Sequence, residues 1–172
     1  MRRAFLIAVA SLVAVTSLGG CVDKAKEARR KELIELMHGN TDDADIKTAI
    51  AKARATVPEF LSALQKPAAN QGQFIVRKSF PRKDGKQQIL WVTGLTYDGT
   101  LLHGKVDDNT AQPGGNIPKD GTVSFKPEEI SDWMYNEGGL AVGGHMLRAL
   151  KKKLSEDEWE RGLGREIKAF KE

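Results

Sequence analysis

The residues best suited to form a binding site lie near the C-terminal end of the chain. Asp132, Trp133 and Tyr135 precede a glycine-rich stretch, and His145 follows it. A Trp beside such a stretch lets a ligand approach the backbone, while a carboxylate, a phenol and an imidazole supply hydrogen bonds. These four residues are candidate binding residues, and Trp91, within an apolar run, is a fifth.

The same residues have a purely structural interpretation. Trp133 would bury its ring and seek one partner for its indole N–H, and Asp132 would accept a cap or turn hydrogen bond. In that case the segment is the centre of the core and not a site. Both interpretations stay open at the level of the sequence.

No other pattern identifies a reaction. His38, His103 and His145 are far apart, and none has a second histidine at a metal-ligand spacing, so no metal is predicted. The pairs Asp107-Asp108 and Glu128-Glu129 are explained by a turn and by a helix start. No Gly-x-Ser-x-Gly turn occurs, and the glycine pairs lack phosphate-binding spacing. The sequence therefore predicts no catalytic residue and no cofactor.

The N-terminal segment is typical of a signal peptide. Arg2 and Arg3 precede an uncharged, mostly apolar run of 15 residues, Ala4–Leu18, and charges return at Asp23. A membrane-spanning helix needs roughly 20 apolar residues, so this run predicts export and not a permanent span.

The apolar run ends in Gly19-Gly20-Cys21, and Cys21 is the chain's single cysteine. This ending resembles the lipobox of bacterial lipoproteins, in which cleavage precedes a cysteine that receives diacylglycerol. The resemblance predicts a signal peptide at 1–20, lipidation at Cys21 and a membrane anchor facing the periplasm. Because Val22, and not an acid, follows the cysteine, the outer membrane is favoured in a Gram-negative host. The alternative is an ordinary signal peptide followed by an incidental cysteine.

The mature chain has the size of one domain. Removal of residues 1–20 leaves 152 of 172 residues and lowers the formal net charge from +4 to +2. Such a balanced charge gives no reason to expect a nucleic-acid partner. Residues 21–40 alternate acids and bases and are interpreted as a charged helical tether. Residues 41–172 are interpreted as a single domain.

Two helices are predicted at the start of this domain. The segment Thr41–Asp43 offers an N-cap, and apolar residues recur at helical spacing through Arg54. Pro58 interrupts this pattern and suits the first turn of a new helix, which extends to Lys66.

The pattern then changes to strands. Asp84-Gly85 and Asp98-Gly99 separate runs rich in β-branched and aromatic residues and predict two hairpins. The predicted strands are 73–80, 88–96, 101–106 and 122–125. We therefore expect an α+β fold, in which a small antiparallel sheet of about four strands packs with N- and C-terminal helices.

Helices are predicted for most of the C-terminal part. Pro127 followed by two acids indicates a helix start, and the spacing of Ile130, Trp133 and Met134 would lay Trp133 on the sheet. Two further helices are predicted around 146–154 and from Ser155, and the polar end from residue 164 is expected to fray.

Several of these segments together resemble one family. They are Thr41-Asp42-Asp43-Ala44, residues 49–54, Pro58-Glu59-Phe60, Trp91-Val92, and residues 130–135 ahead of Gly138 and Gly143-Gly144. The chain, over about residues 41 to 163, resembles the YegJ-like group of bacterial proteins, a domain of unknown function. The resemblance implies a small α+β domain, often exported, without an established activity or cofactor. The family pattern has an aromatic residue after the paired glycines, where this chain has His145.

These features favour a membrane-anchored cell-envelope lipoprotein that acts as a non-enzymatic binding module. Its partner would be a periplasmic protein or an envelope component, and a loose likeness to immunity proteins suggests an inhibitor of a toxin. The alternative is an envelope hydrolase whose acid and base are brought together only by folding. The oligomeric state is not predicted.

Overall fold

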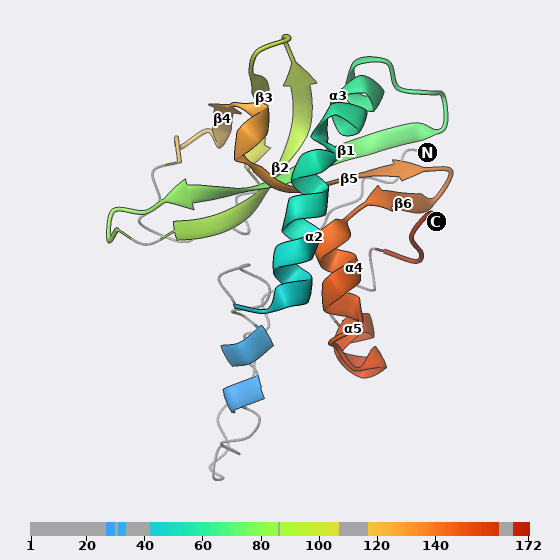
Figure 1. Ribbon diagram of the computed structural model, residues 1–172. Coiled ribbons are helices and arrows are strands. Elements are labelled where there is room, and N and C mark those ends of the chain that lie inside the picture. The colour runs from blue at the N-terminus through green and yellow to red at the C-terminus, as the bar shows by residue number, and fades with distance from the viewer. Residues whose placement is uncertain (1–26, 30, 34–41, 86, 107–116, 162–166) are drawn as a thin grey trace.

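The computed structural model describes residues 27–29, 31–33, 42–85, 87–106, 117–161 and 167–172 (Figure 1). Its helices are α2 (Ala44–Ala55), α3 (Val57–Gln65), α4 (His145–Lys151), α5 (Glu156–Arg161) and the 3₁₀ turn η1 (Pro127–Glu129). Its strands are β1 (Gln71–Pro81), β2 (Gln87–Tyr97), β3 (Leu102–Val106), β4 (Thr122–Phe125), β5 (Ile130–Glu137) and β6 (Leu140–Gly143).

The strands form a single antiparallel sheet in the order β4-β3-β2-β1-β5-β6. The α+β class expected from the sequence is confirmed, but the sheet has six strands and not about four. The first four strands lie where the sequence predicted them. The two additional strands, β5 and β6, come from residues 130–143.

The predicted short helix that starts at Pro127 is wrong beyond its first turn. Pro127–Glu129 forms one 3₁₀ turn, and the chain then enters β5 at Ile130. A register shift between Arg77 and Lys78 of β1 leaves Ser131 of β5 without a directly opposed partner. Because of this bulge, Ile130 and Trp133, three residues apart, face the same side of a strand, which imitates the spacing of a helix.

The start signals predicted for the two N-terminal helices are confirmed. The side chain of Asp43 caps α2, because its Oδ1 accepts the backbone N–H groups of Asp45 (3.0 Å) and Ile46 (3.1 Å). Pro58 lies in the first turn of α3, where its missing N–H removes no helical hydrogen bond. Helices α2 and α4 lie side by side, and α2 also packs on β5 (Figure 1).

Apolar side chains form a core on each face of the sheet, while the β3–β4 part of the second face is exposed. The first core joins Ala53, Val57 and Phe60 of the N-terminal helices to one face, which includes Trp133 and Tyr135. The second core joins residues of α4, α5 and the C-terminal segment to the other face, which includes Trp91 and Met134. Since β5 and β1 are interior strands with two covered faces, they lack the regular alternation of apolar and polar residues that half-exposed strands show.

The C-terminal segment is part of the fold. Phe170 forms a parallel bridge with Ala141 of β6, and the backbone N–H of Ala141 donates to the carbonyl oxygen of Ala169 (2.9 Å). Ile167 is buried in the second core. The expectation that the chain end frays is therefore wrong for residues 167–171, because this segment covers the outer edge of β6.

Part of the predicted tether is described. Residues 27–29 and 31–33 are helical, and Arg29 lies 3.2 Å from the carboxylate of Glu158 in α5 and donates to the carbonyl oxygen of Lys153 (2.7 Å). The signal peptide and Cys21 lie outside the described residues. Among the helices of the described part of the chain, none has both the length and the hydropathy needed to cross a membrane.

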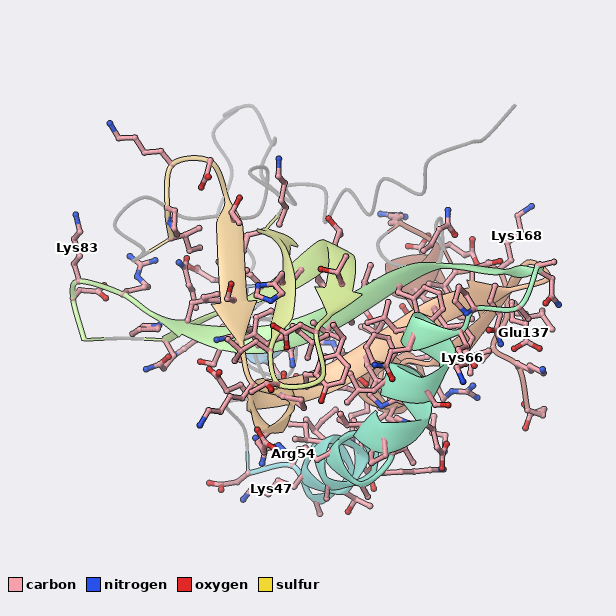
Figure 2. The ribbon with its side chains drawn as sticks, turned by 90° about the horizontal axis from the view of Figure 1, so that it is seen from above. Lys47, Arg54, Lys66, Lys83, Glu137 and Lys168 are labelled. Atoms are coloured by element: carbon pink, nitrogen blue, oxygen red, sulfur yellow. The ribbon has the colours of Figure 1, made fainter. Side chains whose placement is uncertain are left out.

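Figure 2 shows the sheet from above, with α2 and α3 on one side of it. Lys83, on the turn between β1 and β2, lies at one end of the molecule, and Glu137 and Lys168 lie at the opposite end. Lys47, Arg54 and Lys66 mark the helical side.

Candidate functional site

Asp132 is fully buried in β5 and is surrounded by hydrogen-bond donors. Its Oδ1 accepts the backbone N–H groups of Trp133 (3.0 Å) and His145 (3.0 Å), and its Oδ2 accepts that of Met146 (3.0 Å). The carboxylate therefore connects β5 to the first residues of α4. This bonding supports a structural role for Asp132.

Burial raises the pKa of Asp132 to about 6, although the three backbone hydrogen bonds and the charge of Arg77 act in the opposite direction. The folded protein consequently keeps this proton to a higher pH than the unfolded chain does. The contribution of Asp132 to stability is therefore greatest below pH 4 and decreases as the pH rises from about 4 to about 6.

Arg77 of β1 lies opposite Asp132 in the β1–β5 ladder and opposite Trp91 in the β1–β2 ladder. Directly opposed residues of antiparallel strands face the same side, so these three side chains form a row on the second core's face. Arg77 is buried, its Nη1 donates to Sδ of Met146 (2.8 Å), and desolvation lowers its pKa to about 10. Arg77 and Asp132 thus both carry charge at pH 7, and the opposite charges help to offset their burial.

Trp133 points to the other face of the sheet. Its position opposite Val76 places it in the first core, where its ring lies 5.4 Å from that of Phe60. The indole N–H donates to the carbonyl oxygen of Ala53 (3.0 Å) and lies 3.2 Å from Oγ1 of Thr56, so its polar atom is satisfied by α2 and the residue after it.

Tyr135 and His145 both contact Trp133. Tyr135 stacks between Phe74 (4.9 Å between ring centroids) and Trp133 (6.1 Å). The His145 ring meets Trp133 edge-on at 5.4 Å, and its Nε2 lies 3.2 Å from Oγ1 of Thr56. Burial is the main cause that lowers the pKa of His145, and the positive charges of Lys52 and Arg148 lower it further.

The structure therefore divides the five predicted binding residues between two faces. Trp133, Tyr135 and His145 are in contact, whereas Asp132 and Trp91 lie on the opposite face. Asp132 binds the backbone N–H of His145, while the imidazole turns toward Thr56. The sequence located a cluster but could not show that neighbouring residues of a strand point in opposite directions.

The paired glycines permit a close approach to Trp133. Gly143 has a φ of +79°, and a Cβ atom at this position would lie 2.5 Å from both Cε3 and the carbonyl oxygen of Trp133. Only glycine accommodates both this backbone conformation and this contact. The close approach at Gly143 therefore serves core packing.

A small cavity lies at the end of the sheet near the C-terminal segment. Its volume is about 30 Å³, and its lining includes Gln73, Asn136, Ile167 and Lys168. Gln73 has a φ of +55°, rare for a residue other than glycine, and lies at a bulge of β1. A cavity of this size holds a water molecule and is far below the 300 Å³ or so typical of ligand pockets.

A second polar cluster was not predicted. On the exposed face of the sheet, Nε2 of His103 lies 3.0 Å from Oδ2 of Asp98, and Nδ1 of the same ring lies 2.8 Å from Oγ of Ser124. From the sequence, His103 was considered only as a metal ligand, for which it lacks a second histidine at a suitable spacing, and Ser124 lies 21 residues away. The sequence held only an indirect signal for this cluster. If the predicted strands 101–106 and 122–125 are paired in the observed register, His103 and Ser124 lie opposite each other.

Within residues 27–29, 31–33, 42–85, 87–106, 117–161 and 167–172, no three His, Cys, Asp or Glu side chains are placed to hold a metal ion.

Comparison with known proteins gives a family match over most of the chain. The model of a family described as "Uncharacterized protein conserved in bacteria (DUF2314)" matches residues 43–162. The chain is 30% identical over 118 residues to the uncharacterized protein YegJ of Escherichia coli strain K12, which covers 67% of this chain and 72% of that protein. It is 27% identical over 71 residues to a putative ankyrin repeat protein of Neisseria meningitidis serogroup B, covering 40% of this chain and 27% of that protein. No solved structure matches.

Proposed function

The chain belongs to the DUF2314 family of uncharacterized bacterial proteins, and we propose that it is a cell-envelope lipoprotein whose folded domain binds a protein or an envelope component. The YegJ-like resemblance noted from the sequence is confirmed by this membership. Export, lipidation and binding are the parts of the function that we propose.

The proposed anchor rests on the N-terminal sequence. A basic start, a 15-residue apolar run and a lipobox-like ending at Cys21 together favour cleavage before this cysteine and attachment of acyl chains. Each buried CH₂ adds about 0.8 kcal/mol to membrane affinity, so more than one chain holds the domain stably at the bilayer. Metabolic labelling with a fatty acid should mark the wild type but not Cys21→Ser, and labelling of that variant would contradict the anchor.

The observation that carries the binding proposal is the difference between the two edges of the sheet. The C-terminal segment covers β6, since Ala141 exchanges backbone hydrogen bonds with Ala169 and Lys171. At the other edge, the N–H of Val106, next to β3's paired residues, donates to the carbonyl oxygen of Gly121. Hydrogen-bonded and non-hydrogen-bonded pairs alternate along an antiparallel ladder, so this bond makes Lys105–Thr122 and His103–Ser124 non-hydrogen-bonded pairs. This alternation directs the backbone groups of Thr122 and Ser124 away from β3. Oδ1 of Asp120 accepts the N–H of Thr122 (3.1 Å), so the groups that this edge offers for pairing are the N–H of Ser124 and the carbonyl oxygens of both residues.

Outward-facing backbone groups on an edge strand pair readily with an extended segment of another protein. The buried, satisfied state of the aromatic cluster and the small volume of the cavity also favour a partner that binds on the surface over a ligand that is enclosed. We therefore propose that a partner protein adds a strand to β4. An immunity-type inhibitor is one form of this proposal, in which the partner is a periplasmic toxin.

Site-specific photo-cross-linking in native membranes tests this proposal. A photoreactive amino acid at Thr122, on the β4 edge, is expected to give a discrete covalent adduct with one partner, which mass spectrometry would identify. The same amino acid at Leu140, the exposed residue of β6, is the matched control and should give none. Equal adducts at both positions, or none at Thr122, would reject the β4 edge as the binding surface.

Asp132 does not support the hydrolase alternative. Asp132 is buried and accepts three backbone hydrogen bonds, so it is poorly placed to exchange protons with a substrate. A different observation, the hydrogen-bonded chain of Asp98, His103 and Ser124, favours hydrolytic chemistry elsewhere on the sheet.

A further inference from the structure

Asp98, His103 and Ser124 form a line of hydrogen bonds whose first member is held rigidly. Oδ1 of Asp98 accepts the backbone N–H groups of Thr100 (2.8 Å) and Leu101 (2.8 Å), which fixes the carboxylate in the turn between β2 and β3. The hydrogen bond from Leu101, then that from His103, lowers the pKa of Asp98 to about 2. Its second oxygen, Oδ2, is therefore a permanent acceptor for the imidazole at neutral pH.

This carboxylate selects the tautomer of His103. Oδ2 can only accept, so Nε2 of His103 carries the hydrogen and donates it over 3.0 Å. In the neutral ring Nδ1 is then an acceptor, and the hydroxyl of Ser124 donates to it over 2.8 Å. A hydroxyl, a base and an orienting carboxylate thus stand in the order used by serine nucleophiles, with the two ring nitrogens exchanged relative to the usual triad.

The strand register holds the hydroxyl and the base together. His103 and Ser124 are direct partners in the β3–β4 ladder, and the alternation set by Val106 and Gly121 makes them a non-hydrogen-bonded pair. In such pairs the Cα atoms approach to about 4.5 Å, so the side chains are close without any flexible linker. The contact is therefore built into the sheet and does not depend on a mobile loop.

The surroundings of Ser124 include donors for a developing negative charge. Its own backbone N–H points away from β3, toward the outer side of β4. Lys105, two residues from His103 on the same face, presents an exposed ammonium group. A backbone N–H of the nucleophile and a nearby cation are both groups that stabilise the oxyanion of an acyl-transfer intermediate.

We propose that Ser124 is a nucleophile for acyl transfer, with His103 as its general base and Asp98 as the residue that positions His103. Ser124 Oγ would form a bond to the carbonyl carbon of an ester while its proton passes to His103 Nδ1. The carbon–oxygen bond to the alcohol then breaks, and the alcohol leaves with that proton. A water molecule, deprotonated by His103, attacks the acyl-serine, releases the carboxylic acid and returns the proton to Ser124.

The openness of this surface indicates the class of substrate. The side chains of Asp98 and His103 are 51% and 41% exposed, so the cluster lies on a face and not in an enclosed pocket. Such a site suits a short acyl ester carried by a larger molecule, because the bulk of that molecule can rest on the sheet. This inference does not rest on the proposed binding at the β4 edge, but the two share one group, the backbone N–H of Ser124, so a strand paired with β4 would compete with the reaction.

The test uses the full chain in detergent and two probes, a fluorophosphonate and p-nitrophenyl acetate. We expect a single phosphonyl adduct that peptide mapping assigns to Ser124, and an acetyl group on the same residue with release of p-nitrophenolate. Ser124→Ala should abolish both adducts. Ser79→Ala is the matched control, since Ser79 is an exposed sheet serine whose hydroxyl donates to Gln87 instead of a histidine, and it should react as the wild type does.

Replacement of His103 shows whether this base activates Ser124 or whether Ser124 reacts only because it is exposed. His103→Gln keeps a polar side chain on the surface but cannot accept the proton, so the rate of labelling should fall by about 10- to 100-fold, at the lower end of general-base effects because the site is solvated. Circular dichroism would verify that the variant remains folded. The proposal is overturned if Ser124 carries no adduct, if the adduct lies elsewhere, or if His103→Gln reacts within threefold of the wild-type rate.

Discussion

Replacement of Gly143 by alanine should reveal how closely β6 approaches Trp133. The φ of +79° would cost an alanine about 1–2 kcal/mol in backbone strain. The added methyl group would also lie 2.5 Å from Cε3 and from the carbonyl oxygen of Trp133, an overlap that must be relieved by shifts worth about 1–3 kcal/mol. We expect a total loss of about 2–5 kcal/mol in the free energy of unfolding, a large part of the stability of a domain this size.

Gly139→Ala is the matched control for this prediction. Gly139 has a φ of +91°, but a Cβ atom there would meet no heavy atom within 4 Å. Its substitution therefore reports backbone strain alone, about 1–2 kcal/mol. Urea unfolding followed by far-UV circular dichroism would give both values without relying on the fluorescence of the Trp residue under study. Equal losses within 0.5 kcal/mol would refute the argument that contact with Trp133 makes Gly143 necessary.

A double-mutant cycle with Trp133→Leu sharpens the same test. Removal of the indole relieves the overlap with the ring but not that with the backbone carbonyl, so the double variant should be more stable than the sum of the single effects predicts. A coupling energy of about 1 kcal/mol or more is expected for residues in such contact. Additive losses would show that the ring does not press on position 143.

Three further outcomes follow from the fold. The free energy of unfolding of the wild type minus that of Asp132→Asn should decline by about 2 kcal/mol between pH 4 and pH 6, because the folded-state pKa of Asp132 is raised to about 6. A flat difference measured by urea unfolding would contradict this. Ending the chain after residue 166 should destabilise the domain by about 2–5 kcal/mol, because buried Ile167 is lost. The control is Lys171→Ala, which removes only a partly exposed ion pair and should change the midpoint of thermal unfolding little. Asp43→Ala should cost about 1 kcal/mol as the cap of α2 is lost, and an unchanged urea midpoint would refute that role.

Much of the fold could be predicted because local signals agreed with the final structure. The cap at Asp43, Pro58 at the start of α3, and the Asp-Gly turns at 84–85 and 98–99 each act over a few residues. The first four strands followed from these turns. The failure at residues 130–135 arose where a bulge and two covered faces replaced alternation with a helix-like spacing.

The sequence by itself determined the compartment signals, the α+β class, the family resemblance and the cluster of aromatic residues around Trp133, because each depends on residues close together in the chain. Only the tertiary structure decided that Asp132 and Trp133 face opposite sides of the sheet and that the chain end covers β6. It also brought Ser124 to His103 across 21 residues. The physical reason is strand register, since a pairing shift of one residue exchanges the two faces of a strand and leaves its sequence unchanged.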